Sequence, residues 1–76
     1  MERMRGRSSL SPQQQQMLKL AHQGLSRRQI SIALDIHYQT FRIYSQKAIA
    51  RLKPFNNGKT MSWAEAVKIA ALHGLI

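Results

Sequence analysis

An all-α fold is predicted by three features of this 76-residue chain. Helix-start signatures of the form Ser-x-x-Gln or Ser-x-x-Glu occur at Ser11, Ser26 and Ser62, where the serine and the residue three positions later can cap each other's backbone N–H groups. Apolar residues recur at steps of three and four, and no segment alternates as a half-buried strand does. We expect a four-helix bundle with helices at about 12–23, 27–34, 38–53 and 63–73.

The first helix begins with Pro12, a residue favoured at the first helical position because its missing N–H is not needed there. Its apolar residues Met17, Leu18 and Ala21 share one face. Gly24 can adopt the left-handed conformation that ends a helix.

The second helix is short, and its predicted buried face consists of Ile30, Ala33 and Leu34. Asp35 interrupts this pattern, and aspartate is among the few residues besides glycine that tolerate a left-handed turn conformation. Because the breaks on both sides of this helix are only a few residues long, its neighbours must cross it.

The third predicted helix is the longest. Its core residues at steps of three and four are Phe41, Tyr44, Ala48 and Leu52. Pro54 prevents the helix from continuing and opens a turn-rich segment that leads to the fourth helix.

The charge of the chain points to a polyanionic partner. Twelve Lys and Arg oppose three Asp and Glu, which gives a net charge of +9, and no acidic residue occurs from 36 to 64. Nucleic acid is the first candidate and a membrane surface the second. Residues 1–9 are expected to form a basic flexible arm before a single domain at 10–76.

A short helix, a tight turn and a longer helix with a polar face form the helix-turn-helix arrangement, whose second helix enters the DNA major groove. If the core residues of the third helix point inward, its opposite face carries Gln39, Arg42, Ile43 and Gln46. Arginine matches the paired acceptors of guanine, glutamine can pair with adenine, and isoleucine can contact the thymine methyl group. We expect these residues to read bases, while the competing interpretation is an ordinary solvated face.

Phosphate contacts need hydrogen-bond donors and positive charge rather than a base pattern. Ser26, Arg27 and Arg28 lie beside unpaired backbone N–H groups at the start of the second helix, and Thr40 and Lys47 can add to them. These five residues are the predicted phosphate contacts.

Catalysis, metal binding and a cofactor are not expected. The chain has no cysteine, and His22, His37 and His73 have no second ligand at the spacing of a zinc site. The sequence has no pattern that would place a base beside a serine nucleophile, and it has no glycine-rich phosphate loop. Tyr44 and Trp63 can stack on bases, but aromatic residues at core positions more often belong to the core.

Three segments of the sequence resemble a known family of DNA-binding domains. The segments that carry this resemblance are LSPQQQQMLKLAHQGLSRRQISIALDI, TFRIYSQKAIARL and WAEAVKIAALHGLI, which together span residues 10–76. They resemble the LuxR/GerE-type (NarL/FixJ-like) DNA-binding domain of bacterial transcription regulators. The resemblance implies that Arg42, Ile43 and Gln46 face bases, that the start of the second helix and Thr40 hold phosphates, and that the fourth helix forms a homodimer on an inverted repeat.

The chain also departs from the usual pattern of that family. Gln14, Gln16 and Gln29 replace common glutamates. Asp35 replaces the usual turn glycine and His37 the usual small polar cap, while Tyr44 replaces a histidine. The segment between Leu52 and Ala64 is longer than usual.

The sequence therefore predicts sequence-specific binding of double-stranded DNA for transcription regulation, by a protein that is cytoplasmic, associated with the nucleoid, and not an enzyme. No membrane span or signal peptide is expected. Two alternatives stay open. One is a module like region 4 of a sigma factor, which would dock on RNA polymerase, and the other is an adaptor that pairs with a full-length regulator.

Overall fold

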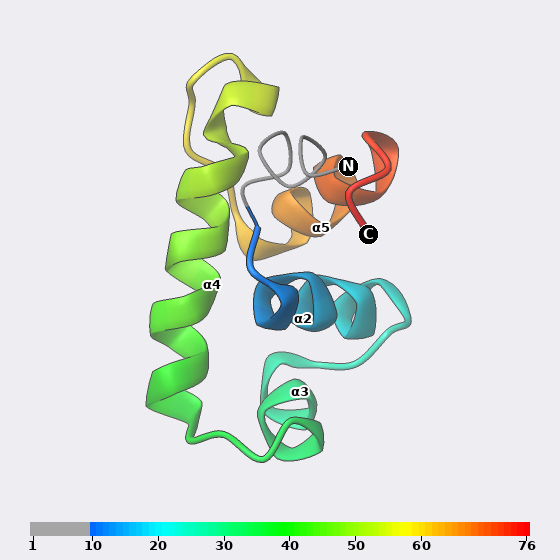
Figure 1. Cartoon of the computed structure of the whole chain (residues 1–76), viewed down its shortest axis with the longest axis vertical. Helices are drawn as coiled ribbons and strands as arrows, with labels where there is room; N and C mark the ends of the chain where they lie inside the picture. Colours follow the sequence, from blue (N-terminus) through cyan, green and yellow to red (C-terminus); the bar gives the residue numbers. More distant parts are fainter. Residues whose placement is uncertain (1–9) are drawn as a thin grey trace.

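The computed structural model describes residues 10–76, and within them the fold is all-α, as the sequence predicts. The elements are α2 (Pro12–His22), α3 (Arg27–Ala33), α4 (Tyr38–Leu52), the short 3₁₀ helix η1 (Lys53–Asn56) and α5 (Trp63–Leu72) (Figure 1). Each α-helix ends one residue before its predicted end. The predicted basic arm at residues 1–9 lies outside the described residues.

Three of the four α-helices begin with the predicted reciprocal cap. The Ser11, Ser26 and Ser62 side chains accept hydrogen bonds from the backbone N–H groups of the residues three positions later. Those residues, Gln14, Gln29 and Glu65, accept in turn from the serine N–H groups. The glutamines thus have a structural role that needs no negative charge.

The start of α4 differs from the other three. Its cap is His37, whose Nδ1 accepts a hydrogen bond from the Gln39 backbone N–H at 3.2 Å. Before it, Asp35 has φ 55°, so it adopts the left-handed conformation that the sequence predicted for the turn. Gly24, with φ 107°, likewise ends α2 as expected.

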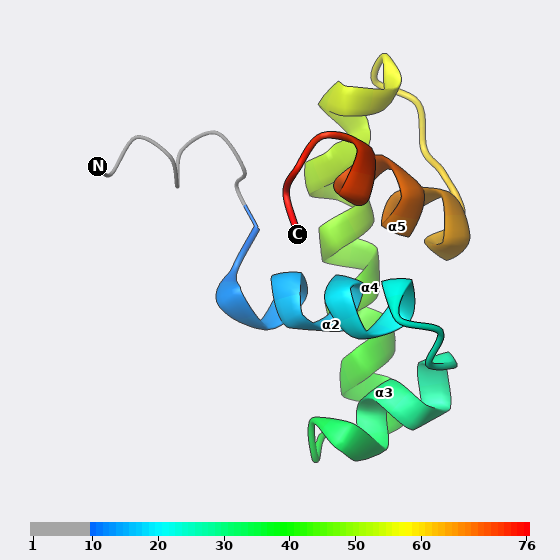
Figure 2. The same cartoon turned by 90° about the vertical axis from the view of Figure 1, so that its right-hand side faces the viewer.

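Helix α4 lies along one side of the molecule, and α2, α3 and α5 all lie on its other side (Figure 1). Seen from that other side, α4 stands behind them (Figure 2). Helices α2, α3 and α5 each pack against α4, and α2 also contacts α3 and α5. One long face of α4 is therefore left without a helical neighbour among the described residues.

The core lies between α4 and the three helices that cover it. Its largest fully buried side chains are Met17, Leu18, Ile30, Phe41 and Leu52. This confirms most of the predicted core.

Three expected core positions differ from the prediction, and one of them is Leu34, which is half-buried. Ala33 is exposed rather than buried, because the seven-residue helix α3 buries only Ile30 and Ser31 against the rest of the domain. Tyr44 is only half-buried, at the border between the core and the open face of α4.

None of the helices in residues 10–76 is both long and apolar enough to cross a membrane.

Candidate nucleic-acid interface

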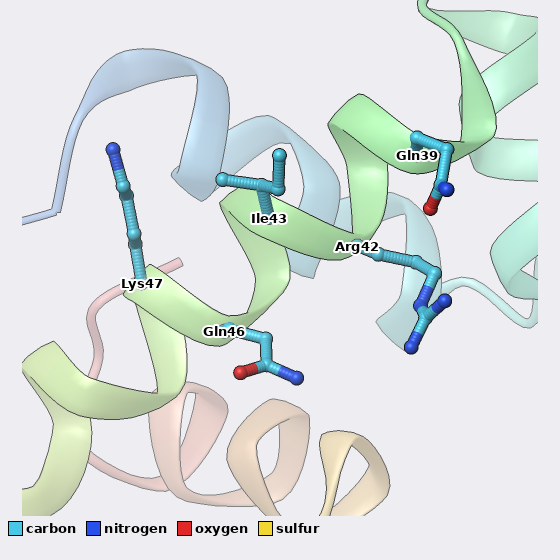
Figure 3. Close-up of a pocket in the computed structure, with 5 residues that line it drawn as sticks. All are labelled: Gln39, Arg42, Ile43, Gln46 and Lys47. Carbon is cyan, nitrogen blue, oxygen red and sulfur yellow. The ribbon is translucent and has the colours of Figure 1, made fainter.

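The open face of α4 carries all four predicted base-reading residues. Together with Lys47 they line one shallow hollow of about 310 Å³ (Figure 3); the five are Gln39, Arg42, Ile43, Gln46 and Lys47. All five side chains are exposed, and Ile43 has an exposed fraction of 56%. The structure therefore brings these residues together on one surface that a ligand can reach.

Three buried residues on the opposite side of α4 hold this face outward. Phe41, Ala48 and Leu52 are completely buried against the other helices. Because an α-helix is a rigid cylinder with 3.6 residues per turn, burying this stripe determines which residues point to solvent. The apolar pattern of the sequence thus sets the orientation of the candidate site.

The five side chains diverge toward two sides of the helix axis. Arg42 and Gln46 extend toward one side, and Ile43 and Lys47 extend toward the side on which α2 lies (Figure 3). A second hollow, of about 210 Å³, lies on the first side, where α4 faces the starts of α3 and α5. Its lining includes Arg27, Arg42, Ser45, Gln46 and Trp63.

The start of α3 has two predicted phosphate contacts that lie close to that second hollow. Arg27 lines it, and Ser26 and Arg27 both line a neighbouring hollow together with Trp63. The reciprocal cap uses the backbone N–H groups of Ser26 and Gln29. The N–H groups of Arg27 and Arg28, in the first turn, have no partner within the helix.

Arg28 has a different neighbour from Arg27. Its guanidinium carbon lies 5.3 Å from the centre of the Tyr38 ring, within the range of a cation–π interaction. This contact links α3 to the start of α4. Arg28 is nevertheless exposed, so the N–H donors of its guanidinium remain accessible to solvent.

The other two predicted phosphate contacts lie elsewhere. Lys47 lines a third hollow, of about 470 Å³, with Tyr44, the α2 cap residue Ser11 and Gln13 in the first turn of α2. Thr40 is half-buried, one helical turn before Tyr44. The structure thus does not join Lys47 to the start of α3, and the five predicted phosphate contacts do not form one cluster.

Several residues that line these hollows were missed by the sequence reasoning. The sequence analysis places Tyr44 in the core, although its aromatic ring and its position at the edge of the apolar stripe were signals for a surface role. Ser45 lines the second hollow, and its hydroxyl donates to the Arg42 carbonyl oxygen at 2.8 Å. Ser11 and Gln13 have no signal in the sequence, because only the packing of α2 on α4 brings them beside Lys47.

The candidate surface is cationic. No Asp or Glu occurs between residues 36 and 64, whereas Arg27, Arg42 and Lys47 line its hollows. Within residues 10–76 no three His, Asp or Glu side chains come close enough to hold a metal ion. The surface suits a ligand that carries negative charge over an extended length.

Comparison with known protein families gives a match. The family model described as GerE, bacterial regulatory proteins of the luxR family, matches residues 8–64. This range includes all nine predicted base and phosphate contacts and ends at the second residue of α5. Neither a curated protein nor a solved structure matches the chain.

Proposed function

We propose that this chain, which belongs to the luxR family of bacterial regulatory proteins, binds a specific double-stranded DNA sequence with α4 in the major groove. The family is one of DNA-binding transcription regulators and is not typically enzymatic, so DNA binding in transcription regulation is the general function of this chain. The groove, the contacts and the assembly are our proposal.

One observation carries the proposal. The face of α4 that its buried stripe turns outward is exposed, has no acidic residue, and gathers base-reading side-chain types around one shallow hollow. The hollow does not enclose a small ligand, because all five lining residues are exposed. A convex helix face of this kind fits the major groove, which admits one α-helix.

In this mode each residue has a chemical role. Arg42 donates to the O6 and N7 acceptors of guanine, and Gln39 and Gln46 pair with adenine. Ile43 contacts the methyl group of thymine, which is the one apolar feature of the groove. From Gln39 to Gln46 these residues span about two turns of α4, which allows them to reach successive base pairs.

The phosphate contacts lie on both sides of these base contacts. Ser26, Arg27 and Arg28 offer side-chain donors and two free backbone N–H groups at the start of α3. Lys47 and Thr40 serve the other side of α4. Contacts of this kind position the helix and make binding salt-dependent without distinguishing sequences.

We further propose that two copies bind an inverted repeat through α5. Leu72 on this helix has an exposed fraction of 78%, the largest among the exposed large apolar side chains of the described residues. Pairing α5 with its copy would remove this side chain from water, and a two-fold dimer matches a two-fold symmetric site.

The decisive experiment is selection of bound sequences from a random duplex pool, followed by a salt titration of the selected and a random duplex. We expect one enriched sequence, a steep loss of affinity with salt on both duplexes, and a residual preference for the selected one at high salt. A selection that enriches no sequence would contradict the proposal, and a shallow salt slope would contradict the phosphate contacts.

The same experiment separates the two alternative functions. An adaptor that pairs with a full-length regulator shows neither a steep salt slope nor enrichment. A module resembling sigma region 4 also enriches a sequence, but RNA polymerase then co-purifies with it. A control with polymerase added to the selected duplex distinguishes that case.

A further inference from the structure

The exposed face of α4 has two edges with different neighbours. Successive residues of an α-helix are rotated by about 100°, so Arg42 and Lys47 point about 140° apart around the axis. Arg42 shares a hollow with Arg27 and Trp63, where α4 meets the starts of α3 and α5. Lys47 shares a hollow with Ser11 and Gln13, where α4 meets the start of α2.

Each edge combines base-reading chemistry with one cation suited to phosphate: the arginine edge has two base-reading residues and the lysine edge has one. The arginine edge consists of Arg27, Arg42 and Gln46, which line the same hollow. The lysine edge consists of Ile43 and Lys47, which extend together to the α2 side of the helix (Figure 3). The two phosphate-binding cations therefore lie on opposite sides of α4.

The width of the major groove indicates which part of the DNA each edge of α4 would face. The major groove is about 12 Å wide, and an α-helix with its side chains is about 10–12 Å across. A helix of this width fills the groove, so its two edges face the two different strands that form the groove walls. A side chain on one edge then reaches bases and phosphates of the strand on that side.

We propose that the arginine edge contacts one DNA strand and the lysine edge contacts the other. On the first strand Arg42 reads a guanine and Arg27 binds a phosphate. On the second strand Ile43 contacts a thymine methyl group and Lys47 binds a phosphate. This assignment rests on the proposed function and adds to it the strand to which each contact belongs.

The base contacts are tested on a half-site duplex taken from the selected sequence, which binds a single chain. Guanines are replaced by 7-deazaguanine, which lacks N7, and thymines by deoxyuridine, which lacks the methyl group, on one strand at a time. Wild-type affinity should fall about tenfold with 7-deazaguanine on one strand only, and Arg42→Ala should lose this sensitivity. Sensitivity to deoxyuridine should be confined to the other strand and absent in Ile43→Ala.

The phosphate contacts are tested with uncharged methylphosphonate linkages, again on one strand at a time. Each neutralised contact should lower the salt slope of the wild type by about 0.9. Arg27→Ala should be insensitive to the change on the guanine-bearing strand, and Lys47→Ala to the change on the thymine-bearing strand. Lys19→Ala is the matched control, because Lys19 is exposed on α2 and lines none of the four hollows described above. This variant should respond like the wild type.

The outcomes distinguish this assignment from the proposed function. If the selection enriches no sequence, the proposed function fails and the assignment fails with it. A sequence can be enriched while the Arg27 and Lys47 variants lose their sensitivity to changes on the same strand. That result, or the same result for the Arg42 and Ile43 variants, overturns only the strand assignment. Variants that all respond like the wild type on both strands would overturn it as well.

Discussion

The ring of Phe41 in α4 meets the ring of Trp63 in the first turn of α5 edge to face, with centroids 5.5 Å apart and an interplanar angle of 79°. Phe41 is completely buried and also stacks on Tyr38 at 5.9 Å. The pair joins the helix proposed to enter DNA to the helix proposed to form the dimer. Its loss should therefore affect the whole domain rather than one helix.

Replacing Phe41 tests this aromatic contact. Phe41→Ala should lower the free energy of unfolding by about 3–5 kcal/mol, because it removes a fully buried ring and leaves a cavity. Phe41→Leu keeps most of the volume and should cost less than about 1.5 kcal/mol. Urea unfolding followed by circular dichroism and by the fluorescence of Trp63, the only tryptophan, measures both. A loss for Phe41→Ala below that of Phe41→Leu would contradict the role of the ring.

Arg42 and Arg27 should differ in how they affect DNA affinity. Arg42→Ala should weaken binding to the selected duplex by about 1–3 kcal/mol and relax the preference at one base pair. Arg27→Ala should weaken binding to selected and random duplexes alike and lower the salt slope by about 1. Fluorescence anisotropy at several salt concentrations measures both effects. Equal losses for the two variants on both duplexes would remove the base-reading role of Arg42.

His37 should act as a weak cap of α4. His37→Ala removes the acceptor of the Gln39 N–H and should lower the free energy of unfolding by about 0.5–1 kcal/mol. His37→Ser supplies the cap that the other three helices use and should restore this stability or exceed it. Urea unfolding of the three proteins is the measurement, and a more stable alanine variant would show that the imidazole does not cap the helix.

The turn between α3 and α4 should be sensitive to side-chain shape at Asp35. A β-branched residue at φ 55° is strained, so Asp35→Val should lower the free energy of unfolding by about 1–2 kcal/mol. Asp35→Gly relieves the left-handed strain and should match or exceed the wild type. Thermal unfolding of both variants tests this, and an unchanged midpoint for the valine variant would exclude strain at this position.

Leu72 tests the dimer proposed through α5. Because this side chain is exposed, Leu72→Glu should leave the stability of the single chain nearly unchanged. It should abolish cooperative binding to a full inverted site while leaving affinity for a half-site intact. Sedimentation of the protein with each duplex gives the stoichiometry. One wild-type chain per full site at saturation would end the dimer proposal.

The four α-helices and their boundaries could be predicted from the sequence, whereas the short 3₁₀ helix η1 could not. Reciprocal caps at Ser11, Ser26 and Ser62 and the stop at Pro54 depend on residues close in the chain, so local chemistry determined them. The outward face of α4 was also predictable, since a periodic apolar stripe implies a polar face opposite to it. The left-handed turn at Asp35 follows in the same way from the tolerance of its side chain.

Only the tertiary structure decided which elements border each edge of that face. Lys47 and Arg27 look equivalent in the sequence, but the crossing of α2, α3 and α5 over α4 puts them beside different helix starts. The exposure of Ala33 and the half-burial of Tyr44 arise from the same packing. Helix crossing depends on contacts between residues distant in the chain, and no local pattern in the sequence contains that information.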